Sequence, residues 1–172
     1  MVQSEPEMVK GSTSMSFVPQ IALVGCGYWG KNLCRNFSQL GALSSVVDAT
    51  ENGQETARSI APNAVITDCF DVVLHDDQIK GIALATPAET HASLAIKAMR
   101  AGKDVFVEKP MALSIDDAKA MHKVALTTDR ILMVGHLLEY HPAVLKLGEL
   151  IDSGELGKIN YVYSNRLNFG KI

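Results

Sequence analysis

Glycine, aspartate and lysine residues stand in this sequence at points where they could bind a dinucleotide and move a proton. The apolar run 21–24 (IALV) leads directly into a Gly-x-Gly-x-x-Gly turn at 25–30 (GCGYWG), and residues 31–40 favour a helix. A strand, a glycine turn and a helix in this order are typical of a dinucleotide-binding unit. In such a unit the pyrophosphate lies on the unpaired N–H groups at the helix N-terminus.

Each glycine of the turn has its own physical role. Gly25 permits the tight turn, Gly27 lets the backbone approach a pyrophosphate, and Gly30 allows the helix to pack closely on the strand. Tyr28 and Trp29 complete the turn, so we expect all five residues to belong to a cofactor site. Because glycines also cluster in ordinary turns, the motif needs support from its context.

Asp48 supplies that context. It closes the next apolar run and follows Gly30 by 18 residues, close to where an acidic residue accepts from the ribose hydroxyls of a dinucleotide. A carboxylate there binds a free 2′-hydroxyl and repels a 2′-phosphate, and neighbouring Ala49 and Thr50 offer no basic partner for a phosphate. The sequence therefore predicts NAD, in preference to NADP, as the cofactor.

Apolar runs and helical patterns alternate along residues 18–140. The runs lie at 21–24, 46–48, 64–66, 81–85, 104–107 and 131–135. Most of them are continuous and not alternating, as expected for parallel strands that are covered on both faces. The pattern predicts the α/β class, with a doubly wound parallel sheet of the Rossmann type.

Further polar residues stand directly after these apolar runs. They are Thr86, Pro87 and His91, then Glu108, Lys109 and Pro110, and finally His136. We expect Thr86 to cap a helix that Pro87 opens, and Ser114 to Asp117 to form a capping box at the start of a later helix. In a doubly wound sheet, ligands bind beyond the carboxyl ends of the strands, so the residues directly after the runs should share one rim with the glycine turn and Asp48.

Two segments lie outside this predicted domain. Residues 1–17 have no continuous apolar core, so they are not a signal peptide and are expected to form a mobile tail. In residues 141–172, Pro142 opens a helix and 159–167 alternates with period two, as a strand does. A lone strand leaves an unpaired edge. We therefore expect 141–172 to be only the start of a second, α+β domain that binds substrate and joins homo-oligomers through its sheet.

The composition excludes some function classes. Of the 172 residues, 47% are hydrophobic and 20% charged, as in ordinary soluble proteins. The net charge of -3 gives no basic footprint for a nucleic acid, and no apolar run is long enough to span a membrane. The three cysteines lack metal-type spacing, which favours free thiols in a reducing cytoplasm.

The sequence resembles the glucose-fructose oxidoreductase and inositol dehydrogenase family, usually called Gfo/Idh/MocA. The resemblance covers roughly residues 18–172. It rests on the glycine turn with Asp48, on Ala85-Thr86-Pro87 with His91, on Ala101-Gly102-Lys103 leading to Glu108-Lys109-Pro110, and on 154–159 (GELGKI). It implies an NAD-dependent dehydrogenase that moves hydride between nicotinamide and a carbon bearing a hydroxyl of a sugar, nucleotide-sugar or cyclitol. Among the members of the family, the nucleotide-sugar 3-dehydrogenases look most similar in residues 136–142 and 164–170.

The resemblance also implies roles for single residues. Lys109 would reach the substrate hydroxyl and help in proton transfer, because an amine shielded from water beside a cationic ring gives up its proton more readily. Glu108 would bond the nicotinamide ribose, orient Lys109 or only cap the end of the strand. Thr86 and Pro87 would line the cofactor's adenosine or ribose side. His91 would have a packing role or a cofactor-side role, and these alternatives stay open.

The sequence departs from the family pattern in two places. Residues 136–141 (HLLEYH) replace the usual Asn or Gln and Arg, and we expect His136 or Tyr140 to approach the nicotinamide or the substrate. His136, Glu139 and His141 do not complete a metal site, so no metal is expected. The family's catalytic histidine of the second domain has no counterpart, so this chain alone is expected not to turn over. The alternative function is a non-catalytic NAD-binding or oligomerisation module.

Overall fold

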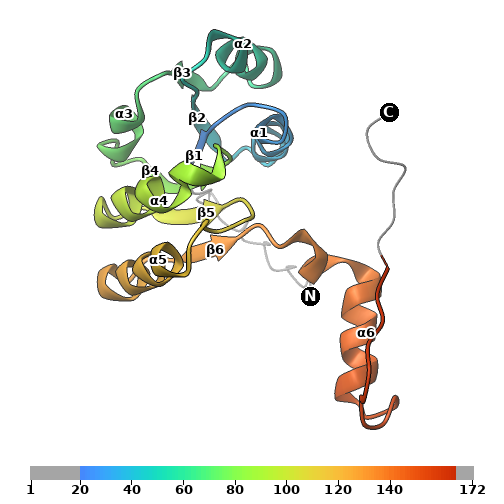
Figure 1. The fold of residues 1–172 in the computed structure, drawn as a ribbon. Helices are drawn as coiled ribbons and strands as arrows, with labels where there is room; N and C mark the ends of the chain where they lie inside the picture. Colours follow the sequence, from blue (N-terminus) through green and yellow to red (C-terminus); the bar gives the residue numbers. More distant parts are fainter. Residues whose placement is uncertain (1–19, 166–172) are drawn as a thin grey trace, which may run out of the picture. The chain divides into compact units, whose positions relative to one another are not determined.

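The computed structural model describes residues 20–165, and these residues form two compact units (Figure 1). The first unit ends at Val134 and the second begins at Gly135. The predicted tail at 1–17 lies outside the described residues. The predicted division into domains at residue 140 falls a few residues after the change of unit, and the assignment of 141–172 to a substrate domain stays a prediction.

A six-stranded parallel sheet forms the centre of the first unit. Its strands are β1 (Gln20–Val24), β2 (Leu43–Val47), β3 (Val65–Thr67), β4 (Ile79–Leu84), β5 (Asp104–Val107) and β6 (Leu132–Val134). Their order in the sheet is β3-β2-β1-β4-β5-β6, and every pairing is parallel. The order reverses between β1 and β4, which is the topological switch point of a doubly wound sheet. The predicted fold class is confirmed.

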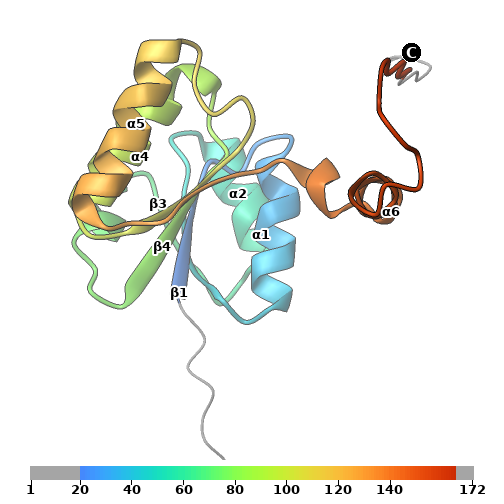
Figure 2. The ribbon, with the colours of Figure 1, turned by 90° about the horizontal axis from the view of Figure 1, so that it is seen from below.

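Helices cover both faces of this sheet (Figure 2). The helices of the first unit are α1 (Gly30–Gln39), α2 (Glu51–Ile60), α3 (Phe70–Leu74), α4 (His91–Arg100) and α5 (Ile115–Thr128), with a 3-10 turn η1 at Ala88–Thr90. Helices α1 and α2 pack on β1, β2 and β3, while α4 and α5 pack against each other and on β4, β5 and β6. Because all strands are parallel, each connection runs from the carboxyl end of one strand back to the amino end of another.

Neighbouring residues in the central strands belong to different sides of the core. Val24, Leu84 and Val107 belong to the buried cluster that includes α4 and α5 residues. Leu23 and Ala83 belong to the second cluster, which includes residues of α1 and α2. Successive side chains of a strand point to opposite faces, so both faces are apolar. This explains why the strands appear in the sequence as continuous apolar runs and not as alternating ones.

The predicted helix starts are right for α5 and wrong for α4. Ser114 caps α5 by accepting a hydrogen bond from the N–H of Asp117. Thr86 does not cap α4, because a 3-10 turn intervenes and α4 begins only at His91. The hydroxyl of Thr86 instead shares a hydrogen bond of 2.7 Å with the hydroxyl of Thr90. The chain thus makes an additional turn between β4 and α4.

The second unit contains a 3-10 turn η2 (Leu137–Tyr140) and helix α6 (Pro142–Asp152). Pro142 opens the helix as predicted, and the ring of His141 caps it by accepting from the N–H of Ala143. In the described part of the predicted strand, residues 159–165, no strand forms. A strand needs a neighbouring strand as hydrogen-bond partner, and the described part of this unit, residues 135–165, supplies none.

Lys103 explains the Ala-Gly-Lys segment that precedes β5. Its side chain is buried, and its ammonium donates to the carbonyl oxygens of Asp76 at 2.7 Å and Ile79 at 2.9 Å. Gly102 has a φ of +80°, which suits a residue that ends a helix. Through these two hydrogen bonds, the ammonium of Lys103 links the segment after α4 to the start of β4.

We expect Lys103→Met to lower the free energy of unfolding by about 2–3 kcal/mol, because it removes hydrogen bonds from a charged donor and leaves carbonyl oxygens without their partner. Urea unfolding followed by circular dichroism measures the change. The matched control is Lys97→Met, since Lys97 makes an exposed ion pair with Asp71, and such pairs contribute little. Equal effects of the two substitutions would contradict the structural role of Lys103.

Candidate cofactor-binding site

A cleft of about 490 Å³ lies at the carboxyl ends of β1, β2 and β4. It sits at the switch point of the sheet, where α/β proteins of this topology bind ligands. The residues that line it are Val24, Gly25, Gly27, Val47, Asp48, Ala49, Thr50, Asp68, Phe70, Ala85, Thr86, Pro87, Thr90 and Leu94. Five of the predicted cofactor residues are therefore at the cleft: Gly25, Gly27, Asp48, Thr86 and Pro87.

The three glycines of the turn differ in what surrounds them. Gly25 has a φ of +91°, and a Cβ there would lie 2.8 Å from the carbonyl oxygen of Ala85. A Cβ on Gly30 would lie only 2.0 Å from the carbonyl oxygen of Gly25, so Gly30 permits close packing of α1 on the turn. Nothing lies within 4 Å of a Cβ on Gly27. The space beside Gly27 is therefore open to a ligand, as a pyrophosphate site requires.

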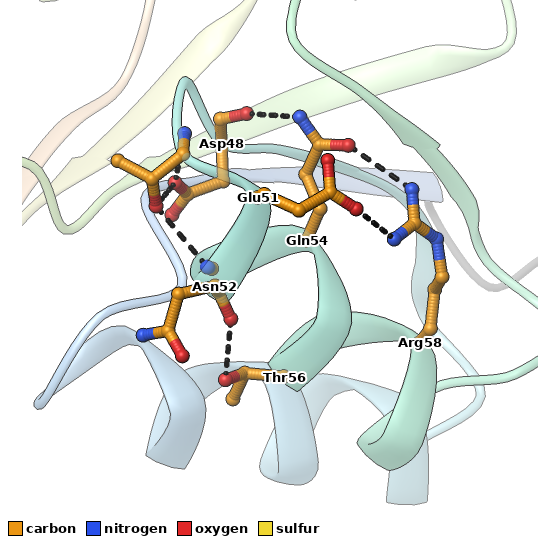
Figure 3. A network of polar contacts seen from close by, with 8 residues as sticks. Asp48, Glu51, Asn52, Gln54, Thr56 and Arg58 are labelled. Carbon is orange, nitrogen blue, oxygen red and sulfur yellow. Dashed lines mark hydrogen bonds and ion pairs between the residues drawn. The ribbon is translucent and has the colours of Figure 1, made fainter.

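The carboxylate of Asp48 is held between the glycine turn and α2. Its Oδ2 accepts from the N–H of Cys26 at 2.6 Å. Its Oδ1 accepts from both the N–H and the hydroxyl of Thr50, at 2.9 and 2.7 Å. Figure 3 shows this carboxylate beside the first turn of α2, where Gln54 also donates to the Asp48 carbonyl oxygen. The end of β2 is thereby fixed to the turn that follows β1.

Burial and hydrogen bonding have opposite effects on the pKa of Asp48. Burial raises it, but the hydrogen bonds from Cys26 and Thr50 outweigh burial and lower the pKa below its usual value. The side chain is consequently a carboxylate at neutral pH. An ionised side chain with a remaining acceptor site is what a ribose hydroxyl needs as its partner.

Glu108 connects the glycine turn to the end of β5. The side chain of Glu108 is buried, and its Oε1 accepts from the indole N–H of Trp29 at 2.6 Å. Its Oε2 accepts from the N–H of Lys109 at 3.1 Å. The carboxylate of Glu108 thus lies on the backbone of Lys109, and the roles predicted for Glu108 stay predictions. Lys109 itself is exposed, at the same edge of the sheet as the cleft.

His91 connects the ends of β4 and β5 in a similar way. Only 1% of its surface is exposed. Its ring nitrogens lie 2.8 Å from the carbonyl oxygen of Pro110 and 2.9 Å from that of Thr86. The Lys109–Pro110 peptide bond is cis. The ring is therefore packed beneath the rim, between two backbone segments, and it does not line the cleft.

The remaining predicted site residues do not line the cleft. Tyr28 is 77% exposed at the tip of the turn. His136 and Tyr140 are exposed residues of the second unit, so their approach to nicotinamide or substrate stays a prediction. Within residues 20–165, no three His, Cys, Asp or Glu side chains are grouped to hold a metal ion. No helix in the same range has the length and apolar character to cross a membrane.

The three cysteines are free thiols in the structure. Cys26 and Cys34 are buried, whereas Cys69 is exposed. The hydrogen bond with Cys34, together with burial, raises the pKa of the Cys26 thiol. Cys26 therefore contributes its backbone N–H to the site, while its side chain belongs to the core beneath the turn.

Sequence reasoning missed two residues beside Asp48. Thr50 was considered only as a residue without positive charge, although its hydroxyl and N–H both bind the carboxylate. Gly53 is a buried glycine inside α2, and a Cβ there would lie 2.1 Å from the Cγ of Asp48. Glycine is an unfavourable residue in a helix, and this was the one available signal for its role.

The chain belongs to the oxidoreductase family with an NAD-binding Rossmann fold, GFO_IDH_MocA, whose model matches residues 20–136. The predicted family is therefore confirmed. The family model describes an NAD-binding fold, and the range that it matches includes both the glycine turn and Asp48 of the cleft. NAD is accordingly the cofactor class of the family to which this chain belongs.

Individual relatives carry different names. The chain is 36% identical over 146 residues to a 2,7-anhydro-N-acetylneuraminate hydratase of Mediterraneibacter gnavus, covering 84% of this chain and 38% of the relative. It is 35% identical over 108 residues to a scyllo-inositol 2-dehydrogenase (NAD(+)) of Bacillus subtilis, covering 63% of this chain and 31% of the relative. The chain thus spans less than half the length of either relative.

Among solved structures, the fold is similar to scyllo-inositol dehydrogenase from Lactobacillus casei with bound NAD(H) and scyllo-inositol. The TM-score is 0.76, with 21% sequence identity, over 82% of this chain and 43% of that chain. At this level of identity the comparison shows the fold. It supports the assignment of the six-stranded sheet with its covering helices to the Rossmann type.

The lowered pKa of Asp48 predicts a specific dependence of stability on pH. The stabilisation that comes from the ionised carboxylate should be fully present above the unfolded-state pKa of about 3.9. It should be lost as the pH falls through the lower pKa of the folded state. We expect Asp48→Asn to be less stable than the unsubstituted chain at neutral pH, and the difference should shrink in acid. Urea unfolding at a series of pH values measures this.

Asp77→Asn is the control for the pH experiment, because Asp77 is an exposed aspartate away from the turn. Its unfolding curves should follow those of the unsubstituted chain at every pH. A constant difference between Asp48→Asn and the unsubstituted chain across the acid range would show that the carboxylate is not stabilised in the folded state.

Proposed function

We propose that the cleft at the switch point binds NAD and that the protein is an oxidoreductase of the dehydrogenase type. The observation that carries the proposal is the combination of an open space beside Gly27 with an ionised Asp48 fixed at the end of β2. A pyrophosphate fits the first feature, and a ribose with a free 2′-hydroxyl fits the second. Both features lie in one cleft.

Different residues of the cleft would bind different parts of NAD. The turn at 25–30 would hold the pyrophosphate at the N-terminus of α1. Asp48 would accept from the adenosine ribose, and apolar side chains of the cleft, Phe70 and Leu94, would contact the adenine. Thr86 and Pro87 would line the side of the cofactor that faces β4. These assignments rest on which residues line the cleft.

Lys109 is the residue that we assign to proton transfer. The Glu108 carboxylate accepts from its N–H, and the carbonyl oxygen of Pro110 lies 2.8 Å from a ring nitrogen of His91. The backbone on both sides of Lys109 is thus fixed while the amine stays accessible. When bound, NAD supplies the hydride acceptor for a substrate alcohol. Lys109 would take the proton of the reacting hydroxyl and return it in the reverse direction.

The substrate that fits this proposal is a small polyhydroxylated molecule: a sugar, a nucleotide-sugar or a cyclitol. Two relatives carry names that refer to a cyclitol and to a sugar acid derivative. One of those names denotes a hydratase, so an assay has to follow the product as well as the nicotinamide. Substrate contacts from His136 and Tyr140, a cytoplasmic location and homo-oligomers formed through a C-terminal sheet also belong to this proposal.

A fluorescence titration tests the cofactor site directly. Trp29 is the only tryptophan among the 172 residues, and it lies in the glycine turn, so NADH bound there should quench its emission. We expect saturable quenching by NADH and weaker binding of NADPH. Gly27→Val should weaken NADH binding by about tenfold or more, which corresponds to about 1.4 kcal/mol, because it fills the space beside the turn.

Gly148→Val is the matched control for this titration, since a Cβ at Gly148 also meets nothing within 4 Å but lies in α6. Its NADH affinity should equal that of the unsubstituted chain. Unfolding curves of both variants show whether they are folded. Folded Gly27→Val protein with full NADH affinity would refute the proposed site, as would a folded unsubstituted chain that binds no NADH.

Turnover tests the proposed role of Lys109. The complete product of the reading frame that encodes this chain should reduce NAD in the presence of a cyclitol or sugar substrate, measured as nicotinamide absorbance together with product analysis. Lys109→Met should lower kcat by about 100-fold or more and leave NADH affinity unchanged. Exposed Lys123 of α5 provides the control, as Lys123→Met. An unchanged kcat in Lys109→Met would remove Lys109 from the mechanism.

A further inference from the structure

We propose that Thr50 and Gly53 determine the preference of this site for NAD over NADP by fixing the position of the Asp48 carboxylate. The inference rests on the proposed NAD site and extends it to two residues of the α2 N-terminus. Both are positioning residues in this proposal, because they act through Asp48. Gly53 does not line the cleft at all.

Thr50 directs the carboxylate with two donors. Its N–H and its hydroxyl both donate to Oδ1 of Asp48, at 2.9 and 2.7 Å. The direction of the hydroxyl is fixed in turn, since its oxygen accepts from the N–H of Gly53 at 3.1 Å. Thr50 is the N-cap of α2, so the same hydroxyl both caps the helix and orients the carboxylate.

The hydrogen bonds leave one part of the carboxylate for a ligand. A carboxylate has about four acceptor sites, two on each oxygen. The two donors of Thr50 occupy Oδ1, while Cys26 takes one site on Oδ2. The remaining site is on Oδ2, and Asp48 lines the cleft. A hydroxyl donor from a ribose is therefore matched to a single, defined acceptor.

Gly53 provides the room that this arrangement needs. A Cβ at position 53 would lie 2.1 Å from Cγ and 2.3 Å from each carboxylate oxygen of Asp48. Real Cβ atoms do not approach other atoms so closely, so any side chain at 53 displaces the carboxylate. Alanine is the more favourable residue inside a helix. Glycine at position 53 therefore lowers the helix propensity of α2, but it leaves the space of a side chain to the carboxylate of Asp48.

The only basic residue of α2 is already paired within the same network. Arg58 donates to Glu51 at 3.1 Å and to the side-chain oxygen of Gln54 at 3.1 Å (Figure 3). Gln54 donates from its amide nitrogen to the carbonyl oxygen of Asp48 at 3.0 Å. The N-terminus of α2 thus orients the Asp48 carboxylate, and the one cation of this helix is engaged by two acceptors.

A fixed carboxylate affects NAD and NADP in opposite directions. It accepts from a free 2′-hydroxyl and repels a 2′-phosphate at the same place. A carboxylate that has moved loses the hydrogen bond to NADH and also weakens the repulsion of NADPH. The quantity that reports its position is therefore the ratio of the NADPH and NADH dissociation constants. General damage to the cleft would weaken binding of both cofactors and leave the ratio unchanged.

The test measures this ratio by quenching of Trp29 in the 172-residue chain and in five variants. Thr50→Val removes the hydroxyl at nearly constant shape, and Thr50→Ser restores a hydroxyl. Gly53→Ala displaces the carboxylate but keeps Thr50. Asp48→Ala shows the ratio without any carboxylate. Thr56→Val is the control, because the hydroxyl of Thr56 bonds only within α2, to the carbonyl oxygen of Asn52. Unfolding curves accompany each titration.

We expect Thr50→Val and Gly53→Ala each to lower the preference for NADH by about tenfold, as expected when a hydrogen bond to a charged group is lost. Thr50→Ser and Thr56→Val should keep the preference of the unsubstituted chain. If Thr50→Val loses its fold together with the cap, Gly53→Ala still decides, because alanine favours the helix. A ratio that falls in Gly53→Ala and is retained in Thr50→Ser supports the proposal.

Two other outcomes overturn it and are distinguishable. If the unsubstituted chain is folded and does not bind NADH, the proposed function fails and this inference fails with it. If NADH binds with a preference that Asp48→Ala abolishes, but folded Gly53→Ala and Thr50→Val keep it within twofold, the NAD site stands and the positioning roles of Thr50 and Gly53 are refuted.

Discussion

The hydrogen bond between the N–H of Cys26 and the carboxylate of Asp48 is the interaction on which the geometry of the cleft depends. It joins the turn after β1 to the residue after β2. Together with the two hydrogen bonds from Thr50 it lowers the pKa of the carboxylate, so the same contact contributes to both the position of the turn and the charge next to it. A parallel sheet brings strand ends together. This side-chain contact adds to the backbone hydrogen bond from the N–H of Gly25 to the carbonyl oxygen of Val47, which joins the same two segments.

Two further side chains extend this connection across the sheet. Glu108 links Trp29 of the glycine turn to the end of β5. His91 links the ends of β4 and β5 through the carbonyl oxygens of Thr86 and Pro110. Glu108 and His91 are buried and polar, and burying polar groups is favourable only when they find partners. Their partners are backbone and indole groups of the rim, so packing and site geometry are stabilised together.

The sequence predicted the fold because its signals are local. Continuous apolar runs and the glycine turn indicated all six strands and their parallel arrangement, and Ser114 marked the start of α5. The contacts that shape the site are not local. Trp29 and Glu108 are 79 residues apart, and Cys26 and Asp48 are 22 residues apart. The start of α4 was placed wrongly at Thr86, because its hydroxyl bonds to Thr90 and not to the helix.

The same contacts separate the cofactor part of the chemistry from the substrate part. The glycine turn, Asp48 and Lys109 all belong to the first unit, and hydrogen bonds through Glu108 connect the turn to Lys109 without any residue beyond Val134. Under the proposed function, one sheet would therefore position both the nicotinamide and the proton-transferring amine. Selectivity for a particular sugar or cyclitol would then not need to change this sheet. This division fits a family whose relatives share the Rossmann unit and carry different substrate names.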